Sequence, residues 1–168
     1  LSSYYRLVYA DVQVGGTEPT KTIANLSFKG QVTLPTGFTP TGAAGSINGV
    51  AVPVGGLYGV TYDAAINQCY AISDDRTTNA RFYTFTINPL TNAVTFTNVT
   101  QLKDASGNPF ALNSLDPEGI ALTKNGTVFI SSEGEANPAL GRVSNPFVKE
   151  FSLTTGQEIR SLAVPSKF

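Results

Sequence analysis

The chain has 168 residues, of which 41% are hydrophobic and only 14% are charged, so it can bury a core and is not disordered. The net charge is −1 and the Lys and Arg residues are scattered, which argues against a nucleic-acid-binding surface. No apolar run approaches the ~20 residues that a membrane-spanning helix needs, and the first residues do not have the pattern of a signal peptide. We expect one domain without a membrane span.

The composition is typical of a secreted, periplasmic or cell-surface β-protein, because Thr, Asn, Gly and Ser are abundant. The chain begins at Leu1 and contains no Met, so we expect a processed product or a fragment whose signal is removed or absent. The single cysteine, Cys69, excludes an internal disulfide. The lack of His excludes a Ser-His-Asp triad and His-based metal sites.

Residues 1–54 are expected to hold two strands and a long loop. Aromatic and β-branched residues predict a strand over residues 4–10, and Gly15, Gly16 and Pro19 break it. Alternation predicts a second strand over residues 26–34. Residues 36–55 are dominated by Gly, Pro, Ala and Ser, which predicts a loop.

Two units of short strands follow, over residues 55–103 and residues 104–168. The expected strands of the first unit are residues 57–62, 69–73, 82–87 and 94–99. Those of the second include residues 120–122, 128–130 and 151–153. No helical periodicity holds over three turns, so the sequence predicts an all-β chain.

The two units resemble each other in order and pattern. Gly59-Val-Thr-Tyr62 matches Gly119-Ile-Ala-Leu122, and Tyr70-Ala-Ile-Ser73 matches Val128-Phe-Ile-Ser131. Tandem four-stranded antiparallel units are typical of β-propeller blades. We therefore predict about two blades plus an N-terminal strand pair, which would be the outer part of a preceding or closing blade. The alternative is a sandwich with two similar hairpin pairs.

Two blades do not close a ring. We expect other chain segments to complete a larger ring, or self-association through open strand edges.

The stretch from Leu115 to Gly134 predicts a hairpin with acids at one end. Asn125-Gly126 between two apolar runs favours a type I′ turn, which needs positive φ at both central residues. Asp116 and Glu118 precede the first strand and Glu133 follows the second. Because these ends of an antiparallel hairpin coincide, the three carboxylates should converge opposite the turn.

The first unit should contribute Asp74, Asp75 and Arg76 to the same face, since they follow its second strand. Clustered carboxylates repel one another unless a cation, an Arg or a shared proton offsets them. Hard oxygen ligands suit Ca²⁺. The predicted metal ligands are Asp74, Asp75, Asp116, Glu118 and Glu133.

Arg76 has a separate predicted role, because it can clamp a phosphate or carboxylate. The alternative is that the acids cap turns and end strands.

Several motifs in this order resemble the phytase-like esterase family. They are Gly56–Asp63, Tyr70–Arg76, Arg81–Phe85, Leu102–Phe110, Ser114–Ile120, Val128–Gly134, Pro146-Phe147 and Val164–Phe168. The DPEG and SSEG pair, at residues 116–119 and 131–134, is the most specific. The resemblance implies an exported propeller of about six or seven blades, acting on a small ester or phosphoester with Ca²⁺. It implies that the functional residues are Asp74, Asp75, Arg76, Asp116, Glu118 and Glu133. We predict that the catalytic residues among them are Arg76, Asp116 and Glu118.

The leading hypothesis is metal-assisted hydrolysis of an ester or phosphoester at an acidic propeller face. The alternative is a non-enzymatic extracellular propeller, for binding, structure or assembly, whose acids hold Ca²⁺ or cap turns.

Overall fold

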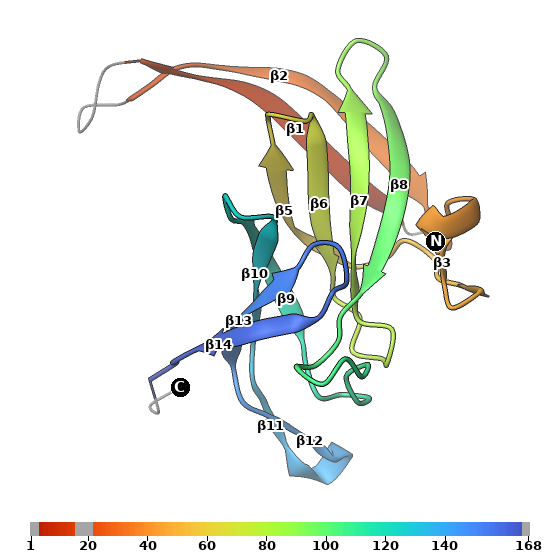
Figure 1. Ribbon diagram of the computed structural model, residues 1–168. Coiled ribbons are helices and arrows are strands. Elements are labelled where there is room, and N and C mark those ends of the chain that lie inside the picture. The colour runs from red at the N-terminus through yellow and green to blue at the C-terminus, as the bar shows by residue number, and fades with distance from the viewer. Residues whose placement is uncertain (1–3, 16–21, 166–168) are drawn as a thin grey trace.

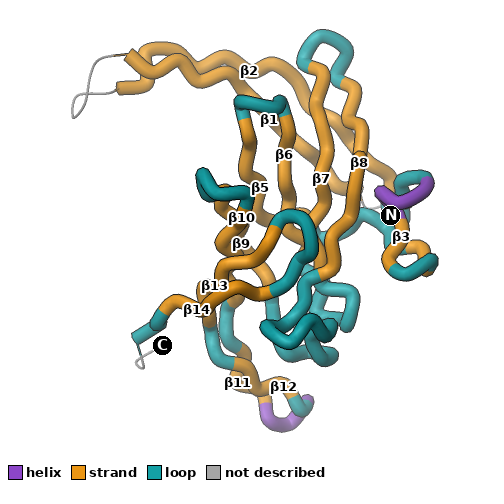
Figure 2. The backbone as a smooth tube through the Cα atoms, viewed as in Figure 1, coloured by secondary structure: helices purple, strands orange, loops and turns teal. Residues whose placement is uncertain are grey.

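The computed structural model describes residues 4–15 and 22–165 and shows a chain built of antiparallel strands (Figures 1 and 2). The predicted break at Gly16 and Pro19 and the last family motif residues, 166–168, lie outside the described residues. The only helices in the described part are two 3₁₀ turns, so the all-β prediction is confirmed. None of the sheets described closes on itself.

A long two-stranded hairpin begins the chain. It pairs β1 (Tyr4–Gly15) with β2 (Thr22–Pro35) in antiparallel register. It lies behind the first four-stranded sheet and reaches beyond it (Figure 1). The prediction that residues 1–54 belong to a preceding or closing blade stays a prediction.

The expectation of a plain loop over residues 36–55 is wrong. This segment holds a 3₁₀ turn, η1 (Gly42–Gly45), and a small hairpin of β3 (Ser46–Ile47) and β4 (Val50–Ala51). The turn is Asn48-Gly49, with φ of 51° and 79°. Both values are left-handed, as a type I′ turn requires, so the Asn-Gly signal that predicted one hairpin applied here as well.

Two four-stranded sheets make up the body of the molecule, each with its strands in up-and-down order. The first is β5 (Leu57–Asp63), β6 (Gln68–Ser73), β7 (Arg81–Asn88) and β8 (Ala93–Gln101). The second is β9 (Pro117–Leu122), β10 (Thr127–Ser132), β13 (Phe147–Ser152) and β14 (Glu158–Leu162). The sheets lie within the predicted units 55–103 and 104–168, whereas the propeller arrangement stays a prediction.

A separate hairpin interrupts the second sheet between β10 and β13. It consists of β11 (Glu135–Asn137), the 3₁₀ turn η2 (Pro138–Leu140) and β12 (Arg142–Ser144). It projects away from the sheet at the lower end of the molecule in Figure 1.

The turn between β9 and β10 differs from the predicted one. Gly126 has φ of 71°, but Asn125 is not among the residues with positive φ, so this is not a type I′ turn. The main-chain N–H of Thr123 donates to the carbonyl of Thr127 at 3.0 Å, which encloses a three-residue loop. A type I turn followed by a left-handed Gly is the usual form of such a loop. The hairpin was predicted correctly and the turn type was wrong.

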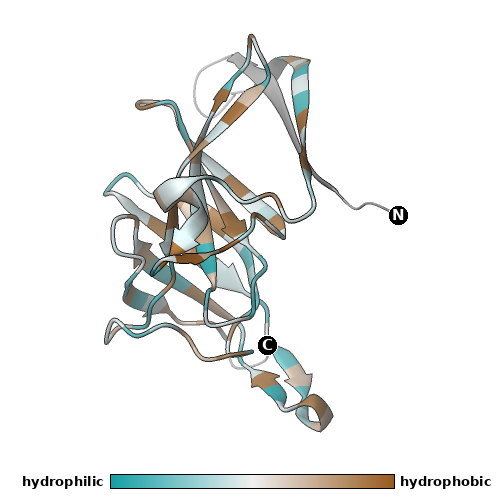
Figure 3. Cartoon of the chain, turned by 90° about the vertical axis from the view of Figure 1, so that its right-hand side faces the viewer, coloured by the Kyte–Doolittle hydropathy of each residue, from teal (hydrophilic) through white to brown (hydrophobic). Residues whose placement is uncertain are grey.

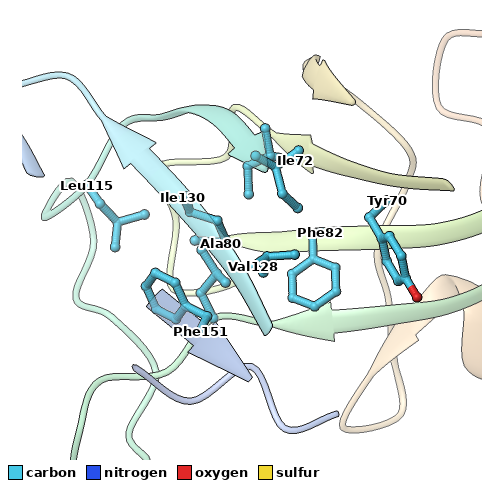
Figure 4. Close-up of a cluster of buried hydrophobic side chains, with 10 residues drawn as sticks. Tyr70, Ile72, Ala80, Phe82, Leu115, Val128, Ile130 and Phe151 are labelled. Atoms are coloured by element: carbon cyan, nitrogen blue, oxygen red, sulfur yellow. The ribbon is translucent and has the colours of Figure 1, made fainter. Parts of the chain in front are cut away.

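The two four-stranded sheets pack against each other through a shared apolar core (Figure 4). Its members come from β6, β7 and Ala80 just before β7 on one side, and from β9, β10 and β13 on the other. Leu102 and Leu115 join them from the connection between the sheets. Phe82, Val128, Ile130 and Phe151 are fully buried. Burial of such side chains stabilises the contact by about 1.5–3 kcal/mol each.

A second core lies on the other face of the first sheet. Cys69, Ala71, Tyr83 and Phe85 pack there with apolar residues that precede β5. The first sheet is therefore buried on both faces, which explains the continuous burial along β6 and β7. In Figure 3 the hydrophobic residues gather on the strands and many of the connecting loops are hydrophilic.

The first strands of the two sheets, β5 and β9, lie side by side at one edge of this core. Thr61 on β5 accepts a hydrogen bond at 3.1 Å from the main-chain N–H of Leu122 on β9. The contact is close enough that only glycine fits at position 59. A Cβ atom there would lie 2.9 Å from the nitrogen of Ile120 and 3.1 Å from the oxygen of Glu118.

Within the described residues, no helix has the length and apolar character needed to cross a membrane. Several large apolar side chains are exposed on the strands, including Phe28 on β2 and Tyr58, Val60 and Tyr62 on β5. The predictions of ring completion by other chain segments and of self-association stay predictions.

The Gly59→Ala variant tests the close approach of β5 and β9. The added methyl group meets backbone atoms that cannot rotate away, so we expect a loss of about 1–3 kcal/mol in the free energy of unfolding. Urea denaturation measures it, with Val60→Ala as the control because Val60 is exposed one position along the strand. Equal stability of the Gly59 variant and the wild type would show that the two strands can separate at no cost.

Candidate active site

Four acidic residues lie at the same end of the two sheets, where strands begin or end. Asp74 directly follows β6, Asp116 directly precedes β9, Glu118 is the second residue of β9, and Glu133 follows β10. Strand direction explains this arrangement, because β5 and β9 start at the end where β6 and β10 finish.

Three of these carboxylates form a compact group. One oxygen from each of Asp74, Asp116 and Glu118 lies within 4.8 Å of the other two. Two oxygens bound to one Ca²⁺ ion are at most about 5 Å apart, since each bond is about 2.3–2.6 Å long. The spacing therefore fits a single cation.

Asp116 is the most constrained member of the group. Its residue surface is only 2% exposed, and its Oδ1 atom has no hydrogen-bond partner. The main chain around it is fixed, because its N–H donates to Oγ of Ser132 at 2.8 Å and its carbonyl accepts from the N–H of Glu133 at 3.2 Å. A buried acceptor without a donor is costly, so this oxygen needs a proton or a cation.

Arg76 neutralises the other oxygen of Asp116. Its Nη2 donates to Oδ2 of Asp116, and its Nη1 donates to Oε2 of Glu135 in the β11–β12 hairpin. The carbonyl of Arg76 also accepts from the N–H of Asn113 at 2.8 Å, which ties this turn to the segment before β9. The guanidinium thus links the first sheet, the second sheet and the hairpin.

The structure does not bring Asp75 into the carboxylate group. Its carboxylate forms an ion pair with Arg81, whose side chain is only 5% exposed. Arg81 and Tyr83 both donate to the carbonyl of Pro53, at 2.8 and 2.7 Å. Burial opposes ionisation of Asp75, but hydrogen bonds from Thr77 and Arg81 outweigh it and lower its pKa. Asp75 anchors the turn that carries Asp74 and Arg76.

Glu133 lies at the exposed margin of the group. It is not one of the three carboxylates whose oxygens meet. The pKa of Glu118 is raised first by burial and then by the charges of Asp116, Asp74 and Glu133.

The pKa of Asp74 responds most strongly to burial and to the neighbouring carboxylates. Its pKa is raised to about 6, first by burial, then by the hydrogen bond that its protonated form makes with Asp116, and then by the charge of that carboxylate. Arg76 opposes the shift but does not cancel it. A proton held on Asp74 can donate to Asp116, which is one way to satisfy the buried acceptor, and a cation is the other.

Sequence reasoning missed Glu135, Arg142 and Arg81. Glu135 lies two residues after Glu133, but the hairpin that turns it toward Arg76 gave no separate signal. Arg142 Nη1 is 3.7 Å from Oε1 of Glu135. Arg81 directly precedes the predicted strand 82–87, and nothing in its neighbours indicated a buried ion pair.

These features define an all-β protein of antiparallel sheets with a carboxylate group that can hold a metal ion at one end. The chain belongs to the phytase-like family. The family model described as "Esterase-like activity of phytase" matches residues 52–168, which confirms the resemblance found in the sequence. Comparison with curated proteins and with solved structures gave no match.

The Asp74→Asn variant tests the raised pKa of Asp74. The folded protein holds more protons than the unfolded chain between about pH 4 and pH 6, so this group makes the fold less stable as pH rises through that range. Without metal, Asp74→Asn should therefore gain stability relative to the wild type as pH increases. Urea unfolding in chelator at several pH values measures the difference, with Asp63→Asn as the matched change at the opposite end of β5. A difference that does not vary with pH would contradict the assignment.

Proposed function

We propose that this chain forms part of an exported β-propeller hydrolase that uses a metal ion, Ca²⁺ by its ligand chemistry, to cleave an ester or phosphoester. The observation that carries the proposal is the buried Oδ1 of Asp116, which has no partner and lies beside two further carboxylates. Membership of a family described by esterase-like activity supports the reaction class.

The residues present fit the proposed ion. Ca²⁺ takes 6–8 oxygen ligands and tolerates irregular geometry. Asp74, Asp116 and Glu118 would hold it, with Glu133 adding negative charge at the margin. When bound, the ion would polarise the scissile bond as a Lewis acid.

The other steps belong to side chains of this chain. Arg76 would orient the anionic or carbonyl oxygen of the substrate, because its guanidinium is about one-third exposed beside the carboxylates. Asp116 would keep that guanidinium in place through its Oδ2 atom. Glu118 would accept the proton of the attacking water through the carboxylate oxygen that does not hold the ion.

The propeller proposal rests on how the two sheets meet. Each is a four-stranded antiparallel meander, the two share an apolar core, and their first strands lie side by side. This is the relation expected of neighbouring blades around a central axis.

Hydrolysis of p-nitrophenyl esters and of phytate by the full-length protein, with and without chelator, tests the function. We expect turnover that chelator abolishes and Ca²⁺ restores. Asp116→Asn should reduce it roughly a hundredfold or more, by analogy with the loss of metal-site partners. Asp63→Asn is the matched control, since that acid caps the turn at the other end of β5 by accepting from the N–H of Ala65.

Two outcomes would contradict the proposal. Turnover that is unaffected by chelator would remove the metal from the mechanism. Ca²⁺ binding without hydrolysis of either substrate would favour the non-enzymatic alternative.

A further inference from the structure

The β11–β12 hairpin brings a second guanidinium close to the carboxylate group. Glu135 and Arg142 are diagonal neighbours on paired strands, because Glu135 is opposite Ser144 and Arg142 is opposite Asn137. Arg142 Nη1 lies 3.7 Å from Oε1 of Glu135, while Arg76 Nη1 contacts Oε2 of the same carboxylate. One carboxylate is therefore held between two guanidinium groups that come from different parts of the chain.

These three side chains are accessible to a ligand. Arg76 is 32% exposed, Arg142 is 39% exposed and Glu135 is 23% exposed. The hairpin extends from the second sheet without being part of it. The ion pair that Arg142 forms among the described residues is with Glu135 of its own hairpin.

We propose that Arg76 and Arg142 form a binding site for the oxyanion of the substrate, and that Glu135 occupies this site as an internal competitor. A carboxylate held between two guanidinium groups has the same charge and donor arrangement as a bound phosphate or carboxylate. An incoming oxyanion would displace Glu135 from both arginines. The proposal extends the proposed function, because it assigns a place for the anionic group of the substrate beside the carboxylates.

The competition follows from charge. Glu135 satisfies both arginines when no ligand is present, and its negative charge repels any anion that approaches them. Removal of that charge should strengthen anion binding, whereas removal of Arg142 should weaken it. A merely structural ion pair would show neither effect.

Titration of the full chain with sulfate, followed by NMR or calorimetry in Ca²⁺ and again in chelator, tests the proposal. Glu135→Gln should bind sulfate at least roughly fivefold more tightly than the wild type, the change expected from removing one charge at about 4 Å in water. Adding Arg142→Gln should abolish that gain. Acetate in place of sulfate distinguishes a site for carboxylates from one for tetrahedral anions.

Two control variants make the same charge changes elsewhere. Glu158→Gln removes a carboxylate paired with Lys149, and Arg160→Gln removes a guanidinium paired with Glu150. Neither should alter sulfate affinity beyond the small effect of net charge. If Glu135→Gln fails to fold, Arg142→Gln alone decides, because it should bind sulfate more weakly than Arg160→Gln does.

Unchanged or weaker binding of both anions by folded Glu135→Gln would overturn the proposal, as would equal effects of Glu135→Gln and Glu158→Gln. These outcomes do not depend on turnover. Tighter binding by Glu135→Gln in a protein that hydrolyses nothing would support the anion site and contradict only the proposed function.

Discussion

The burial of the Asp116 carboxylate constrains the whole acidic end of the two sheets, because it places a negative charge where water cannot solvate it. Arg76 compensates for one oxygen, and a proton or cation is required for the other. Asp74 responds by holding a proton more tightly than an exposed carboxyl does. Removal of Arg76 would leave the buried Asp116 carboxylate without its ion-pair partner. In comparable buried pairs, such a loss lowers the free energy of unfolding by about 3–5 kcal/mol.

The packing of the two sheets brings the carboxylates at their acidic end close together. The shared apolar core holds β6 against β9, and the close approach at Gly59 sets the distance between β5 and β9. The Asp75–Arg81 ion pair holds the turn after β6 in place. Three independent features thus place Asp74 beside Asp116, so the carboxylate group is a consequence of the fold and not of one flexible loop.

The directions of successive antiparallel strands made part of the carboxylate group predictable from the sequence. The hairpin rule placed Asp116, Glu118 and Glu133 at one end, and the matching strands placed Asp74 there too. The role of Asp75 was not predictable, because its partner Arg81 is buried by residues from before β5. The positions of Glu135 and Arg142 depend on the conformation of the inserted β11–β12 hairpin, which neither hydrophobic periodicity nor turn signals predict. The turn at Asn125-Gly126 differed because the loop includes Lys124, so Asn-Gly identifies a hairpin better than it identifies the turn type.

A cation beside Oδ1 of Asp116 is the central claim, because the proposed hydrolysis and the anion site beside it both depend on how that charge is balanced. Anomalous diffraction from crystals of the protein soaked in a lanthanide, as a stand-in for Ca²⁺, tests it most directly. We predict a peak within bonding distance of Oδ1 of Asp116, shared with Asp74 and Glu118. Lanthanide peaks at carboxylates on the surface, with no peak beside Oδ1 of Asp116, would contradict this claim.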